Sequence, residues 1–264
     1  MHAAEREQLI LQLLQQRGFV AFQELDHHLD ASPATLRRDL DKLETAGRIV
    51  RVRGGARLAQ PQGSTAEAGD VQHLHGVPFH QNIARNTDAK RAIGRAAAEL
   101  CRPRESVIID GGSTTLQMCP YLDALELQVL SNSLHIINAL LPQPSTRIAI
   151  PAGTVFREQN IVLSPFDDDG MAGYRASRMF MGAAALGRHG VMQADLILAQ
   201  AERRLLERAD ELIVLVDSSK FEAPAGHVVC ALDEVDTVIT DRAIRPEHVK
   251  LLKEKGVNLV IAKG

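Results

Sequence analysis

Hydroxyl and arginine side chains gather near the N-terminus at spacings that suit contacts to a nucleic acid. Ser32 is a favourable helix N-cap, and Pro33 suits the first helical position, where no backbone N–H is needed. Leu36, Leu40 and Leu43 recur at i, i+4 and i+7 and predict one apolar helix face. Small residues and arginine elsewhere on this helix are typical of a helix that enters the DNA major groove. Its candidate DNA contacts are Ser32, Ala34, Thr35, Arg37 and Arg38.

A short basic strand follows this helix. Gly47 suits the helix C-terminus, and the apolar residues Ile49 and Val52 then alternate loosely with arginines up to a glycine pair at 54–55. Residues 37–57 hold seven basic and three acidic side chains, a net charge of +4, although the whole chain has a formal net charge of −3. We therefore expect a two-stranded wing that contacts backbone phosphates through Arg51 and Arg53.

An ordinary solvated helix face is the alternative interpretation of these arginines. The cap, the leucine spacing, the glycine stop and the wing together favour DNA binding over that alternative. Two shorter helices are predicted upstream and complete a winged helix-turn-helix. Their apolar faces are formed by Ile10, Leu13 and Leu14 in the first helix and by Phe22, Leu25 and Leu29 in the second.

These residues also carry a family resemblance. Ser32–Ala56 resembles the N-terminal signature of the DeoR family of bacterial transcriptional regulators, and the resemblance continues over nearly the whole chain. It implies double-stranded operator DNA as a partner and a homodimer or homotetramer that places its reading helices on repeated half-sites. The matching positions are Leu36-Arg37-Arg38-Asp39-Leu40, Leu43, Gly47, Arg51 and Gly54-Gly55-Ala56.

Length and composition indicate a second, larger domain. The 264 residues divide into an expected DNA-binding domain at 1–58, a linker at 59–77 that is poor in large apolar residues, and a domain at 78–264. Three cysteines at unpaired spacing give no disulfide framework or zinc site, and we expect neither metal nor cofactor. Neither a signal peptide nor a membrane span is recognisable, so a cytoplasmic protein is expected.

The larger domain alternates short apolar runs with amphipathic stretches, which predicts a mostly parallel sheet covered by helices on both faces, a Rossmann-like α/β fold. An additional helix from Thr87 precedes the first run. The predicted strands are Val107–Ile109, Leu127–Leu130, Ile148–Ile150, Met179–Met181, Leu212–Val216, Val235–Ile239 and Val257–Ile261. The predicted helices between them are Thr115–Leu122, Leu134–Leu141, Leu196–Ala209 and Arg245–Lys255.

The loops at the carboxyl ends of such strands are where ligands bind. The loop at 110–115, Asp-Gly-Gly-Ser-Thr-Thr, follows a strand and opens a helix, so its backbone N–H groups suit an anion. It lacks the lysine of a Walker A loop and the GxGxxG pattern of a dinucleotide fingerprint. The alternative is a tight turn in which Ser113 or Thr114 only caps the helix.

Three further segments have suitable chemistry. Ser131-Asn132-Ser133 follows a strand, the turn with Gly153 precedes Arg157, and Lys220 stands at another strand end. Helix capping or ordinary solvation is the alternative for each. The full set of candidate effector-binding residues is Asp110, Gly111, Gly112, Ser113, Thr114, Thr115, Ser131, Asn132, Gly153, Arg157, Asp195 and Lys220.

The family resemblance extends to these loops. DeoR-family effector domains resemble ribose-5-phosphate isomerase and glucosamine-6-phosphate deaminase in fold and sense phosphorylated sugars or related metabolites. Where many members carry an acidic residue and later a lysine, this chain has Leu198-Ala199-Gln200-Ala201-Glu202. That segment is more similar to the L-ascorbate-utilisation repressors of the family, which implies a phosphorylated sugar acid, L-ascorbate 6-phosphate, as effector.

Two function classes follow from these patterns. The first is a ligand-responsive transcriptional regulator, most simply a repressor of a carbohydrate- or sugar-acid-utilisation operon. The second is a sugar-phosphate isomerase or deaminase with an accessory helical domain. An isomerase needs a positioned general base. Asp110 or Asp195 would have to serve, and no acid–base partner is recognisable for either, so the regulator is favoured.

Overall fold

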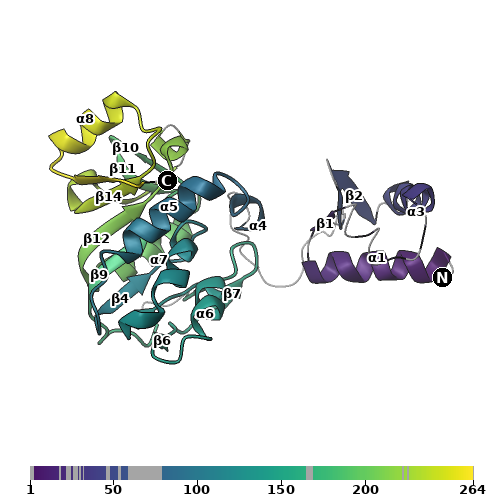
Figure 1. Cartoon of the computed structure of the whole chain (residues 1–264), viewed down its shortest axis with the longest axis horizontal. Coiled ribbons are helices and arrows are strands. Elements are labelled where there is room, and N and C mark those ends of the chain that lie inside the picture. Colours follow the sequence, from purple (N-terminus) through teal and green to yellow (C-terminus); the bar gives the residue numbers. More distant parts are fainter. Residues whose placement is uncertain are drawn as a thin grey trace. The chain divides into compact units, whose positions relative to one another are not determined.

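The chain forms two compact units, Met1–Val71 and Gln72–Gly264, in a computed structural model (Figure 1). Each unit is described by itself. The expected linker at 59–77 lies outside the described residues, so its boundaries remain a prediction. The structure describes residues 3–17, 19–21, 25, 29, 31, 33–45, 48–52, 55–58, 79–164, 169–221, 223–224 and 226–263.

The N-terminal unit confirms the predicted reading helix and wing. The two wing strands pair antiparallel, and a third strand that the sequence pattern did not reveal joins them in the order β1-β3-β2. Of the predicted second helix, only Leu25 and Leu29 are described, and both are buried. The elements are α1 (Ala3–Arg17), β1 (Phe19–Ala21), α3 (Pro33–Thr45), β2 (Ile49–Val52) and β3 (Gly55–Leu58).

The apolar face of α3 closes the small core of this unit. Leu36, Leu40 and Leu43 are each at most 2% exposed and pack with apolar residues of α1. Polar contacts also join the two helices, because Arg6 Nε lies 2.7 Å from Asp39 Oδ2. Burying one face of α3 in this way leaves its other face to solvent.

The larger unit contains a seven-stranded sheet in the order β15-β14-β12-β9-β4-β5-β6, in which every neighbouring pair is parallel (Figure 1). All seven predicted strands lie in it, so the predicted α/β architecture is confirmed. The strands are β4 (Ser106–Ile109), β5 (Gln128–Leu130), β6 (Arg147–Ala149), β9 (Ala176–Met181), β12 (Ala209–Leu215), β14 (Thr237–Thr240) and β15 (Asn258–Ile261).

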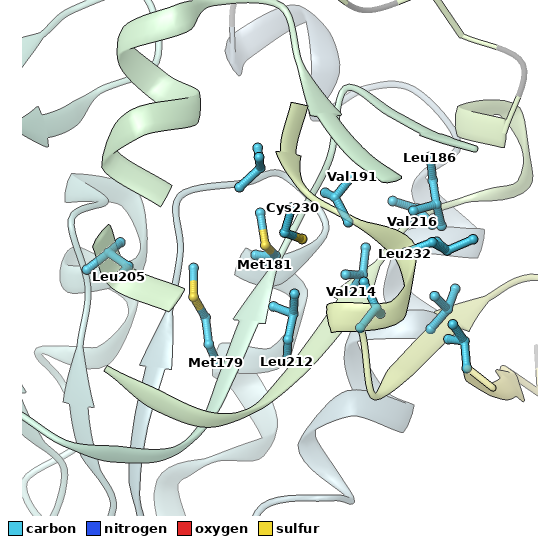
Figure 2. Packing of buried hydrophobic residues seen from close by; sticks show 14 of the residues in the cluster. Met179, Met181, Leu186, Val191, Leu205, Leu212, Val214, Val216, Cys230 and Leu232 are labelled. Atoms are coloured by element: carbon cyan, nitrogen blue, oxygen red, sulfur yellow. The ribbon is translucent and has the colours of Figure 1, made fainter. Parts of the chain in front are cut away.

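Both faces of the sheet are buried. Met179 and Met181 of β9 belong to one apolar cluster together with Leu212 and Val214 of β12, and Figure 2 shows these four side chains. Phe180, between the two methionines, belongs to a second cluster on the other face. This alternation explains why the strands are short continuous apolar runs in the sequence.

The predicted helices of this unit agree with the structure except at two places, and the short helix α4 (Phe79–Asn82) was not predicted. The predicted helix at Thr115–Leu122 is a 3-10 helix with Pro120 inside it, and α7 ends at Leu206 because Ala209 already pairs with β9. The helices are α4 (Phe79–Asn82), α5 (Thr87–Ala98), α6 (Leu134–Leu140), α7 (Leu196–Leu206) and α8 (Pro246–Glu254), with 3-10 turns η1 (Thr115–Tyr121), η2 (Asp123–Leu125), η3 (Ser218–Phe221) and η4 (Leu232–Glu234).

Five short strands outside the main sheet were not predicted. They form an antiparallel pair, β7 and β8, and a three-stranded antiparallel sheet in the order β10-β11-β13. No helix in the described part of the chain is long and apolar enough to cross a membrane. The five strands are β7 (Thr154–Phe156), β8 (Ile161–Leu163), β10 (Ala185–Gly187), β11 (Gly190–Gln193) and β13 (His227–Cys230).

Gly94 of α5 permits a close approach to η1, the turn that begins where the loop at 110–115 ends. A Cβ atom at Gly94 would lie 2.5 Å from the carbonyl carbon of Gln117. We expect Gly94→Ala to lower the free energy of unfolding by about 1–3 kcal/mol, because overpacking outweighs the better helix propensity of alanine. Chemical denaturation measures this, with Gly173→Ala as the control, since a Cβ atom there meets nothing within 4 Å. Equal stability of both variants would contradict the close approach.

Candidate functional site

A cavity of about 460 Å³ opens at the carboxyl ends of β4, β9 and β12. This is the edge at which parallel α/β sheets bind ligands. Many of the described residues around it come from the loop after β4, the connection after β9, the end of β11 and η3 after β12, and others come from residues 79–85 and from α7. Among them are Gly111, Gly112, Ser113, Thr114, Gly182, Gln193 and Lys220.

The loop after β4 is held by its own backbone and by one hydroxyl. Thr115 Oγ1 donates to the carbonyl oxygens of Asp110 (2.8 Å) and Gly112 (3.0 Å). A Cβ atom at Gly111 would lie 2.7 Å from Cγ2 of Ile161, so glycine is required there by close packing. Thr114 stands at the N-cap position of η1 without a capping side-chain hydrogen bond. The interpretation of Thr114 as only a helix cap therefore finds no support.

The predicted effector residues divide into two groups. Gly111, Gly112, Ser113, Thr114 and Lys220 line the cavity together, although Lys220 is far from the others in the sequence. The remaining candidates do not line it. They are Asp110, Thr115, Ser131, Asn132, Gly153, Arg157 and Asp195.

Ser131 and Asn132 lie directly behind the cavity loop and position it. Asn132 Oδ1 accepts from the backbone N–H of Gly111 (3.1 Å), and its Nδ2 donates to Asp110 Oδ1 (3.2 Å). Ser131 Oγ accepts from the backbone N–H of Ser133 (3.2 Å). All three loop residues at 131–133 are buried, so their polar groups serve the loop itself.

Gly153, Arg157 and Asp195 have other surroundings. A Cβ atom at Gly153 would lie 2.4 Å from the carbonyl oxygen of Leu163. Glycine is therefore needed for the close approach of the chain before β7 to the end of β8. Arg157 is exposed in the turn between those strands. Asp195 caps α7 and accepts from the backbone N–H of Ile197 at 2.9 Å. The geometry gives a structural reason for the glycine and the aspartate.

Cations line the cavity from two sides. Lys220 follows Asp217, whose carboxylate accepts from Asn86 Nδ2 at 2.9 Å, and Arg85 is exposed at the cavity wall. Burial, with repulsion from Lys220 and Arg85, lowers the pKa of Lys90 to about 8 despite the opposing attraction of Asp217. The positive charge and the free loop N–H groups suit an anionic ligand. Sequence reasoning missed Arg85 because it precedes the first predicted strand.

A second residue missed by sequence reasoning is Glu202 of α7, whose carboxyl group interacts electrostatically with that of Asp110. Both side chains are at most 1% exposed. Gln193 Nε2 donates to Glu202 Oε1 at 2.6 Å, while Asp110 Oδ2 and Glu202 Oε2 have no donor among the described groups. Burial raises the pKa of Asp110 to about 6, and burial with the negative charge of Asp110 raises the pKa of Glu202 well above its ordinary value. Two carboxyl groups buried together disfavour double ionisation, so we expect one proton to be held between them at neutral pH.

The DNA-reading candidates are only partly described. Arg38 is exposed on α3 and Thr35 is half-buried. Lys42, which contributes to the local positive charge, is bonded to Glu7 of α1 at 2.7 Å. Ser32 and Arg53 lie outside the described residues, as do the side chains of Ala34, Arg37 and Arg51.

No group of three or more His, Cys, Asp or Glu side chains is placed to hold a metal ion in the described part of the chain. The three cysteines are free and buried, and burial raises the pKa of each thiol to about 12. A thiol with so high a pKa is mostly protonated at neutral pH and is a weak nucleophile.

Comparison with known families matches both units. Residues 6–62 match a DeoR-like helix-turn-helix domain, and residues 85–242 match a DeoR C terminal sensor domain. The chain is 34% identical over 260 residues to the HTH-type transcriptional regulator UlaR of Shigella dysenteriae and to that of Escherichia coli K12, and each alignment covers 98% of this chain and 99% of the relative.

Solved structures align over parts of the chain. Ribose 5-phosphate isomerase A from Methanocaldococcus jannaschii aligns with a TM-score of 0.39 at 17% identity, covering 52% of this chain and 55% of the isomerase. The delta subunit of eIF2B from Chaetomium thermophilum aligns with a TM-score of 0.42 at 14% identity, covering 68% and 57%. At such scores the strand pairing of this chain itself remains the basis for its fold.

The buried carboxyl pair predicts a pH dependence of stability. The folded chain keeps a proton that the unfolded chain releases above about pH 4.3, so the free energy of unfolding falls as the pH rises from there through the raised pKa values. In Glu202→Gln, the amide can donate to Asp110 Oδ2 and still accept from Gln193. We expect a higher Tm than in the parent chain, with the larger gain at about pH 8 and the smaller at about pH 5.

Thermal unfolding of the full chain at both pH values measures this difference. Glu99→Gln is the matched control, because Glu99 is exposed on the protein surface. A Tm that falls by the same amount at both pH values would show that Glu202 needs its charge, and the shared proton would be wrong.

Proposed function

Since this chain belongs to the DeoR family of transcriptional regulators, we propose that it represses a carbohydrate- or sugar-acid-utilisation operon until a phosphorylated metabolite binds its C-terminal domain. The chain is a DNA-binding regulator and not an enzyme. The isomerase alternative is not favoured, because the similar full-length proteins are named regulators and carry the same DNA-binding domain.

The observation that carries the DNA-binding part of the proposal is the orientation of α3. Its leucine face is buried against α1, and Arg38 stands exposed on the other side. A helix held in this way can enter the major groove, with the β2–β3 wing contacting the flanking phosphates. Dimers or tetramers of the chain would place two such helices on half-sites, in the cytoplasm where the operator lies.

The cavity supports an anionic effector of sugar size. Ser113 and Thr114 offer hydroxyl groups, the loop offers backbone N–H groups, and Arg85 and Lys220 supply positive charge. L-ascorbate 6-phosphate is the first effector to test, because the chain is similar to regulators named UlaR over nearly its whole length. Release of DNA requires that the effector bind the DNA-incompetent state more tightly than the competent one.

The reading helix is tested by Arg38→Ala. Loss of a direct DNA contact should weaken binding to an operator, selected with the parent protein from a random DNA pool, by about 1–3 kcal/mol. Gel-shift titration measures the dissociation constant, and Arg91→Ala in α5 of the other unit is the control. Unchanged affinity would remove Arg38 from the interface.

The effector pocket is tested by Thr114→Val, which removes a hydroxyl group at nearly constant volume. We expect unchanged operator affinity but release of the operator only at concentrations of L-ascorbate 6-phosphate about tenfold higher, the usual effect of one lost hydrogen bond to a charged group. Thr154→Val, at an exposed position of β7, is the control. Normal release by Thr114→Val would contradict the pocket, and turnover of the compound would favour the enzyme.

A further inference from the structure

Residues 79–86, the first residues of the larger unit that the structure describes, are called the leading segment. It consists of α4 and the turn into α5, and residues 59–78 connect it to the wing of the N-terminal unit. Phe79, Asn82 and Arg85 of this segment line the same cavity as the loop after β4 and Lys220. A ligand in the cavity therefore meets the part of the chain that leads toward the DNA-binding domain.

The outer contacts of the leading segment are specific. The ring of Phe79 stacks on that of His135 with centroids 3.9 Å apart and planes 12° from parallel. The backbone N–H of Phe79 donates to the carbonyl oxygen of Glu158 at 3.2 Å. At the other end, Asn86 has a left-handed backbone (φ 50°) and donates from Nδ2 to Asp217 Oδ1 at 2.9 Å.

Lys90 of α5 holds the middle of the segment. Its side chain is 1% exposed and is among the largest fully buried side chains of the described residues. Its ammonium group donates to the carbonyl oxygen of Asn82 and lies 3.4 Å from Asn82 Oδ1. A buried ammonium group is unfavourable unless it is bonded or paired, so this contact strongly favours one position of the Asn82 backbone.

The charges around Lys90 make the position of the Asn82 backbone sensitive to a bound anion. Arg85 and Lys220 each repel the ammonium group of Lys90, and Asp217 attracts it. An anion in the cavity reduces this repulsion and attracts Arg85, which the leading segment carries. The segment can then be drawn toward the loop after β4, whose backbone is anchored to β9 by the Asp110 N–H to Phe180 carbonyl bond (2.9 Å).

We propose that Lys90 is a positioning residue that holds the leading segment as a movable wall of the cavity, and that this segment transmits occupancy of the cavity toward the DNA-binding domain. The inference rests on the proposed function, because it takes the cavity as the effector site. The loop after β4 binds the anion, whereas Lys90 determines how strongly that binding is coupled to DNA release.

The test compares full-length Lys90→Met with the parent chain. Methionine retains an unbranched apolar side chain and removes the ammonium group. The coupling is measured as the ratio of the dissociation constants of L-ascorbate 6-phosphate for the operator-bound and the free protein. We expect a ratio of about tenfold or more in the parent and a ratio near one in Lys90→Met, with unchanged operator affinity in the absence of the compound. Arg91→Met, at an exposed position of the same helix, should retain the parent ratio.

Hydrogen exchange of the free proteins provides a readout that needs no ligand. Lys90→Met should speed amide exchange in residues 79–86, including the Ile83 N–H that donates to Phe79, and leave β9 unchanged. His135→Ala, which removes the ring stack at a residue outside the cavity, should have the same two effects and serves if Lys90→Met does not fold. A parent-like ratio, or unchanged exchange in residues 79–86, overturns the proposal for Lys90.

The two proposals fail differently. If the parent protein binds the operator but no phosphorylated sugar or sugar acid releases it, the effector assignment fails. Faster exchange in the leading segment of Lys90→Met would then still support the positioning role of Lys90. If the parent releases the operator normally and Lys90→Met does so with an unchanged ratio, the proposed function stands and the role of Lys90 is wrong.

Discussion

The parallel alignment of β4, β9 and β12 is the constraint on which the site depends. Parallel neighbours end at the same edge of the sheet, so the loops after them meet although about a hundred residues separate the first from the last. Each strand is buried on both faces, as the alternation at 179–181 shows, and the loop positions are therefore rigid. A backbone hydrogen bond from Asp110 to Phe180 ties the anion loop directly to this frame.

Opposite charges lie close together at this edge. Arg85 and Lys220 line the cavity and repel the buried ammonium group of Lys90, whereas the side chains of Asp110 and Glu202 are buried. The raised pKa values of the carboxyl pair limit the negative charge near the proposed anion site, while Asn132 donates to Asp110 Oδ1 and Gln193 donates to Glu202 Oε1. Buried polar groups that are bonded in this way determine loop geometry more sharply than apolar packing does.

In the small N-terminal unit, one face of α3 must be buried while the other stays open to solvent. The leucines of α3 bury its apolar face, and the Arg6–Asp39 ion pair adds a directional contact between α1 and α3. Lys42 is bonded to Glu7 of α1 in the same way, so the two ion pairs together leave the net local charge unchanged.

Local patterns alone determined the domain types, the reading helix, the wing and all seven sheet strands, because apolar periodicity, caps and glycine stops act over a few residues. Five of the predicted effector residues line the cavity. Four of them, at 111–114, could be predicted together because they lie in one contiguous loop. Only the tertiary structure decided which distant groups join them. Arg85 and Glu202 reach the site through sheet order and helix packing, and Asp195 serves as a helix cap instead. The pairing of β11 with β13 joins residues far apart in the sequence, such as Val191 and Cys230, and no local signal records such a contact.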